Sequence, residues 1–193
     1  MPTLVTVGTH GHSFEIEDPD LLRGYGRAGW GLTVSGSRRG GSEVPFTWVH
    51  AAIPLVASSS EKTSKTIFAR LIEVRVAFTT NQTTTGIMGG TVTHLHVWHG
   101  QDRIAVFEDF SSQGPLLEKA LDPVVTLSPL RALGLSIGVD FPQFIDELPS
   151  EIGLPWPAVT FNWAAADYEV ESGPRIKEGG GVVAEPRQPG TRG

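Results

Sequence analysis

The feature that most constrains the fold is a strict alternation of large apolar residues with small or polar residues around position 137. In "LGLSIGVDF" the odd-numbered side chains are bulky, and the even-numbered ones are small or acidic. The bulky set is Leu133, Leu135, Ile137, Val139 and Phe141, and the other set is Gly134, Ser136, Gly138 and Asp140. Successive side chains of a strand point to opposite faces, so the pattern predicts a half-buried β-strand. The small residues predict close approach of another layer or backbone.

Several other segments show the same period of two. Residues 46–51 place Phe46, Trp48 and His50 on one face, and the longest strand is predicted over 66–80. In that strand, the face predicted to be buried carries Phe68, Ile72, Val74, Val76 and Phe78. The face predicted to be exposed to solvent, the wet face, carries Leu71, Glu73, Arg75 and Ala77. Eight or more short strands separated by turns predict an all-β fold, an antiparallel β-sandwich or barrel. Only 114–122 and 141–153 could hold a short helix.

Composition excludes several classes of partner. The net charge is −6, and the 15 Lys and Arg residues form no run longer than Arg38-Arg39, so we expect no nucleic-acid partner. The absence of cysteine excludes disulfides and thiolate sites. The N-terminus does not have the pattern of a signal peptide, and no segment has the ~20 apolar residues that cross a bilayer. We therefore expect a soluble, cytoplasmic protein with no membrane partner, and leave non-classical export open.

The end of the chain differs from the rest. Residues 172–193 are rich in Gly and Pro and contain no aromatic residue. Such a segment buries too little apolar area to offset the entropy lost on ordering. We predict a β-sandwich domain over 1–171 and a disordered, flexible tail over 172–193, with an arm that orders against another subunit as the alternative.

Histidines are concentrated in two clusters. The segment "THLHVWHG" contains His94, His96 and His99, and His94 and His96 share a predicted strand face with Trp98. Leu95 and Val97 are the better core candidates, so the two imidazoles are expected outside. Two imidazoles at i and i+2 with a third from the turn are a zinc ligand set, so a divalent metal site at His94, His96 and His99 is one hypothesis. The alternative is a set of partly exposed imidazoles in cross-strand contacts.

The other histidine cluster is His10 and His12. These residues would form a four-histidine site with His94 and His96 only if the two predicted strands paired side by side. A different hypothesis is carbohydrate binding, because an exposed tryptophan beside polar residues is suited to holding a sugar ring. Its candidate residues are Trp98, Asp102 and Arg103. The segment "HGQDR" also has the residues of a hairpin turn, with Gly100 able to take positive φ.

The order of motifs resembles that of an uncharacterised group of small bacterial β-sandwich proteins, classed as a domain of unknown function. The motifs are "GRAGWGLTVSG", "FTWVHAAIP", "VTHLHVWHGQDRIAVFED", "GLSIGVDF" and "VTFNWAAADYEV", and the resemblance covers roughly 29–170. The resemblance implies a sandwich with a jelly-roll-like strand order, and it implies no activity. His99 departs from the group, where an Asp or another turn former is usual.

Three functions follow as alternatives. We expect a non-catalytic binding or assembly module that self-associates as a homo-oligomer, because 144–156 carries apolar residues that need a cover. The second is a lectin-like binder using Trp98. The third is a metal-dependent enzyme built on His94, His96 and His99. The segment "GLSIG" around Ser136 imitates a nucleophile motif, but that motif requires a sharp turn into a helix, whereas here the strand continues.

Overall fold

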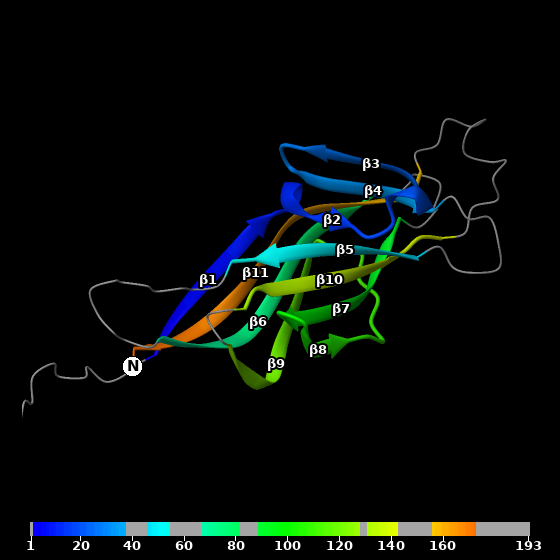
Figure 1. Ribbon diagram of the computed structural model, residues 1–193. Helices are drawn as coiled ribbons and strands as arrows, with labels where there is room; N and C mark the ends of the chain where they lie inside the picture. The colour runs from blue at the N-terminus through cyan, green and yellow to red at the C-terminus, as the bar shows by residue number, and fades with distance from the viewer. Residues whose placement is uncertain are drawn as a thin grey trace, which may run out of the picture.

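A computed structural model describes residues 2–37, 46–54, 67–81, 89–127, 131–142 and 156–172 (Figure 1). Within these ranges the chain forms eleven strands: β1 (Thr3–His10), β2 (Glu15–Ile16), β3 (Leu22–Ala28), β4 (Gly31–Ser37), β5 (Phe46–Ile53), β6 (Ile67–Thr80), β7 (Thr91–His99), β8 (Asp102–Phe107), β9 (Leu116–Leu127), β10 (Leu133–Asp140) and β11 (Ala158–Ser172). Two 3-10 turns, η1 (Gly11–Ser13) and η2 (Pro19–Leu21), complete the described elements. Among the described residues, no helix has the length and apolar character needed to cross a membrane.

The strand order is that of a jelly roll. Sheet A runs β3-β4-β11-β6-β9, with β1 also paired to β11, and sheet B runs β2-β5-β10-β7-β8. From β4 onward the strands pair in a nested way: β4 with β11, β5 with β10, β6 with β9, and β7 with β8. The chain is therefore one long antiparallel ribbon rolled into two facing sheets. Figure 1 shows β5, β10, β7 and β8 side by side in front of β11, β6 and β9. The predicted antiparallel β-sandwich with jelly-roll-like order is confirmed.

The core lies between the sheets and is built by the predicted alternation. Strand β10 contributes Leu133, Leu135, Ile137 and Val139, all at most 1% exposed, and Leu95 and Val97 of β7 are fully buried. Sheet A contributes fully buried side chains from its own strands: Leu32, Val34, Leu71, Val74, Val76, Phe78, Val159, Phe161 and Tyr168. The removal of this apolar surface from water is the main stabilising term of such a fold.

Two β-bulges correct the predicted faces. In β6 the pairing register shifts around Ile72, so Leu71, predicted on the wet face, is fully buried. In β7 the register shifts at Thr93, so Val92 is also fully buried, although strict alternation would place it on the face of His94. A bulge inserts one extra residue and reverses the parity of every residue beyond it.

The short helix considered for 114–122 does not form. Residues 116–122 belong to strand β9, in which Leu117 and Leu121 are buried while Glu118 and Ala120 are exposed. The leucine spacing of four fits a helix and a strand equally well, and pairing with β6 decides for the strand. The helix predicted over 141–153 and the predicted tail fall almost wholly outside the described residues, although Ser172 ends β11.

The outer faces of the two sheets differ in chemistry. On sheet A, Arg75 donates to Asp167 at 2.6 Å, and Arg70 forms an ion pair with Glu169. Trp163 also lies on sheet A, paired with His10 and Ala77, and is 37% exposed. The outer face of sheet B instead carries aromatic and imidazole rings.

Candidate functional site

The candidate site is the outer face of sheet B, where ring-bearing strands flank a strand of small residues. Directly paired residues across β5, β10 and β7 form three rows: Trp48, Gly138 and His94; His50, Ser136 and His96; Ala52, Gly134 and Trp98. Because directly opposite residues of a sheet share a face, each row places a small residue between larger ones. The even-numbered set of β10 is therefore the floor of a surface lined by rings.

Around Gly138, toward the Asp140 end of β10, the rings close over the floor. We call Phe46, Trp48, His94 and His96 the aromatic cluster. The ring centroids of Trp48 and His96 lie 4.7 Å apart, and those of Phe46 and His94 lie 5.3 Å apart, so the rings meet across β10. A Cβ at Gly138 would lie 2.6 Å from Phe46 Cζ and 2.8 Å from His94 Cβ. Gly138 is thus required for the cluster to pack onto the sheet.

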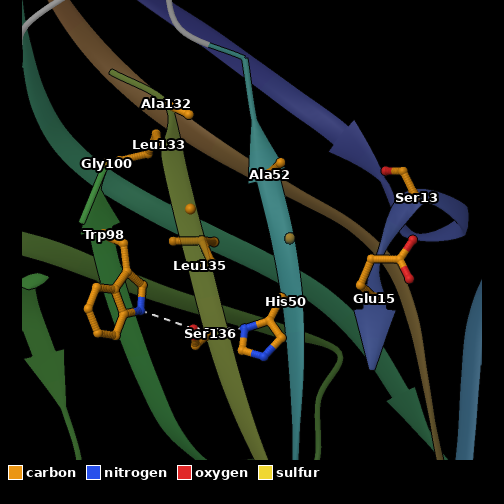
Figure 2. Close-up of a pocket in the computed structure, with 12 residues that line it drawn as sticks. Ser13, Glu15, His50, Ala52, Trp98, Gly100, Ala132, Leu133, Leu135 and Ser136 are labelled. Atoms are coloured by element: carbon orange, nitrogen blue, oxygen red, sulfur yellow. Dashed lines mark hydrogen bonds between the residues drawn. The ribbon is translucent and has the colours of Figure 1, made fainter. Parts of the chain in front are cut away.

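At the other end the floor is open. A Cβ at Gly134 would meet no atom closer than 3.8 Å. Above it lies a depression of about 470 Å³, the Trp98 pocket, lined by Trp98, His50, Ala52, Gly134, Ser136, Glu15 and Ser13, with neighbouring backbone. Figure 2 shows Trp98 and His50 on either side of Ser136, with Glu15 and Ser13 further out on the adjoining strand and turn.

A chain of polar contacts fixes the rings of the Trp98 pocket. Trp98 Nε1 donates to Ser136 Oγ at 3.0 Å, and His50 Nδ1 lies 2.9 Å from the same oxygen. On its far side, His50 Nε2 lies 3.6 Å from Glu17 Oε2. Indole is a donor only, so Ser136 Oγ accepts from Trp98, and its own proton and second lone pair let it either donate to His50 Nδ1 or accept from it, according to the imidazole tautomer. These contacts hold the Trp98 and His50 rings on either side of Ser136.

This chain places a carboxylate, an imidazole and a serine hydroxyl in sequence, as nucleophilic sites do. However, the Trp98 N–H points at Ser136 Oγ itself and draws electron density from that oxygen, which makes it a poorer nucleophile. Ser136 is also only 8% exposed. The arrangement therefore suits the orientation of Trp98 and His50 better than attack on a substrate.

A second depression lies at the opposite end of β10. This Asp140 pocket measures about 250 Å³ and is lined by Thr91, Thr93, Ser111, Asp140, Phe141, Pro142 and Gly89. Asp140 pairs with Phe46 on one side and with Thr91 on the other, so it lies on the same outer face as Ser136. Thr93 is the bulged residue of β7, and bulges often redirect a side chain beside a functional site.

The three residues of the proposed metal site do not all come together. His94 and His96 lie on the outer face, whereas His99 is paired with the core residue Leu133, is 7% exposed and faces inward. His96 Nε2 instead contacts Glu108 Oε1 at 3.1 Å, and His94 Nδ1 contacts Thr93 Oγ1 at 2.9 Å. Across the described ranges, no three His, Asp or Glu side chains are grouped in a way that could hold an ion.

The first histidine cluster also lies elsewhere. Strand β1 pairs with β11 in sheet A, and His10 is opposite Trp163. The strand pairing that a four-histidine site with His94 and His96 required is therefore not present.

Of the predicted ligand-binding residues, the structure brings two together. Arg103 is paired with Trp98, and its Cζ lies 5.9 Å from the centroid of the indole. Asp102 instead forms an ion pair with Arg131. The predicted turn role of Gly100 is confirmed, with φ of +65° between the paired residues His99 and Asp102.

Sequence reasoning missed His50, Ser136 and Glu17 as site residues. The shared parity of Phe46, Trp48 and His50 and the small alternate residues of β10 were visible signals. What was missing was the strand order, because only the placement of β10 between β5 and β7 brings these sets together.

Comparison with known proteins adds no assignment: no family model matches the sequence, and no curated protein does. The resemblance to the bacterial group therefore stays a prediction. The predicted self-association also stays a prediction, because 144–155, on which it largely rests, lies outside the described residues.

Proposed function

We propose that the protein is a non-catalytic binding module that holds a carbohydrate on the outer face of sheet B, with one sugar ring in the Trp98 pocket. The observation that carries the proposal is a partly exposed indole, fixed by hydrogen bonding, at the wall of an open pocket that also presents polar side chains. Sugars combine an apolar C–H face with a rim of hydroxyls, and this combination matches such a wall.

The fixed orientation of Trp98 supports the proposal. Its N–H bond to Ser136 turns the pyrrole edge toward β10, and Arg103 approaches from β8 on the other side of β7. A ring held in one rotamer loses little conformational entropy when a ligand stacks on it. Tryptophan also combines a large apolar surface with a rigid geometry.

The charge of the pocket indicates a neutral ligand. Glu15 lines it and is paired with Arg27 at 3.0 Å, Glu17 lies behind His50, and no Lys or Arg is among its lining residues in the described part of the chain. Carboxylate, imidazole and serine groups accept and donate hydrogen bonds to hydroxyls. An anionic sugar would find no Lys or Arg among these described lining residues to pair with.

The test is a glycan array with wild-type protein, followed by isothermal titration calorimetry on the glycans that bind. We expect Trp98→Ala to weaken binding by roughly tenfold or more, equivalent to about 1.4 kcal/mol. Trp163→Ala, a change at an exposed tryptophan of sheet A, is the matched control and should bind as the wild type does. The proposal fails if no glycan binds, or if folded Trp98→Ala protein keeps wild-type affinity.

A further inference from the structure

We infer that the ligand is an extended, neutral chain of linked sugars that lies along β10 and reaches from the Trp98 pocket to the Asp140 pocket. This inference rests on the carbohydrate binding proposed above and goes further by naming the form of the substrate. A single sugar would need only the first pocket, whereas the structure offers a second one aligned with it.

The alignment follows from the parity and length of β10. Ser136 and Asp140 share the outer face and belong to different pockets. A strand rises about 3.3 Å per residue, so four residues separate them by roughly 13 Å, and Gly134 lies farther still from Asp140. That distance exceeds the width of one six-membered ring, so a ligand in both pockets must be a chain.

The surface between the pockets is apolar and raised. Phe46, Trp48 and His94 close over Gly138 there, and each ring remains partly exposed. Aromatic rings are suitable supports for the C–H faces of sugars that cross from one pocket to the other. A chain along β10 would thus meet polar groups at its ends and aromatic surface at its middle.

The Asp140 pocket has the chemistry of a hydroxyl-binding subsite. The hydroxyls of Thr91, Thr93 and Ser111 donate and accept, and the Asp140 carboxylate accepts. Without the bulge in β7, Thr93 would point inward like Leu95. No Lys or Arg lines this pocket among the described residues, so both ends of the path favour a neutral chain over a polyanion.

The experiment is isothermal titration calorimetry of the full chain with linear β-1,4-linked gluco-oligosaccharides, from the disaccharide to the hexasaccharide. We expect the dissociation constant to fall by about tenfold or more along the series, as a second subsite is engaged. Asp140→Asn should remove most of that gain for the hexasaccharide and leave disaccharide affinity unchanged. Trp98→Ala should weaken the binding of every oligosaccharide in the series. Glu118→Gln, at an exposed position of β9 in sheet A, is the control and should bind as the wild type does.

The two proposals fail in different ways. If the disaccharide and hexasaccharide bind equally and Asp140→Asn has no effect, the extended-chain inference is overturned and the single-pocket proposal stands. If none of the oligosaccharides binds, this inference is overturned, and the glycan array decides the proposal on which it rests. Circular dichroism of each variant confirms that a loss of affinity is not a loss of fold.

Discussion

At the scale of single residues, Tyr168 places a polar group in the core that the fold tolerates rather than uses. Tyr168 is fully buried, and its hydroxyl has no hydrogen-bond partner among the described residues. Burial raises the pKa of its phenol well above the ordinary value of 10. A buried hydroxyl without a partner costs about 1–3 kcal/mol, so this residue is a point where stability can be gained.

We predict that Tyr168→Phe raises the free energy of unfolding at pH 7 by about 1 kcal/mol, measured by urea denaturation. The raised pKa adds a pH dependence. Because the folded state holds the Tyr168 proton more tightly than the unfolded state, the wild type keeps its full stability below the unfolded-state pKa of about 10. It loses stability as the pH rises above that value toward the folded-state pKa. The variant should therefore lose less stability than the wild type above pH 10.

The matched control is Tyr25→Phe, because Tyr25 is 57% exposed. It should change neither the stability at pH 7 nor the alkaline slope. A less stable Tyr168→Phe protein would show that the hydroxyl has a stabilising partner after all.

At the scale of elements, the β3–β4 hairpin approaches β11 through glycine. Gly31 has φ of +152°, and a Cβ there would lie 1.9 Å from the Phe161 carbonyl oxygen. Asn162 Nδ2 donates to the Trp30 carbonyl oxygen beside it at 3.0 Å. The hairpin can therefore pair with β11 only while position 31 has no side chain.

We predict that Gly31→Ala lowers the free energy of unfolding by about 2 kcal/mol or more, because the cost of a strained backbone adds to the cost of displacing a strand. Gly26→Ala in the same hairpin is the control, since a Cβ there meets nothing within 4 Å. That control should change stability by about 0.5 kcal/mol or less. Equal melting temperatures for the two variants would contradict the close approach.

The sequence carried most of the element-level information, but not all of it. Alternation from Leu133 to Phe141 predicted both the strand and its buried face, because its side chains contrast strongly in size and polarity. The same reasoning from alternation failed in β6 at Ile72 and in β7 at Thr93. A bulge changes which face the following residues occupy, and nothing in the composition of the segment marks it. Alternation also failed at Leu117 and Leu121, where helix and strand periods coincide and a neighbouring strand decides.

The candidate site was predictable only in part for the same reason. Trp98 and Arg103 are five residues apart across one turn, so local reasoning found them together. His50, Ser136 and Glu17 come from three distant segments. Their meeting depends on strand order, which the period of a single segment does not encode.

At the scale of the whole molecule, one core joins both sheets, and its contacts link distant parts of the chain. Thr3 is paired with Val170, and β4 is paired with β11. A protein dominated by such non-local pairings gains little from forming any one part alone. The fold should therefore behave as a single cooperative unit.

We predict that urea unfolding followed by far-ultraviolet circular dichroism and by tryptophan fluorescence gives coincident transitions. The variants Trp98→Phe and Trp163→Phe remove reporters from sheet B and sheet A respectively. Each should leave fluorescence and dichroism midpoints that agree with one another. A sheet-specific transition at lower urea would show that the two layers unfold separately.

The pairing of β1 with β11 also determines how the molecule can be attached to other things. Both strands belong to sheet A, and they run antiparallel with Thr3 beside Val170. A dye, resin linker or fused protein joined near either residue would leave from the rear layer. The ring-lined surface of sheet B would then still face outward, which favours capture assays on an immobilised sample.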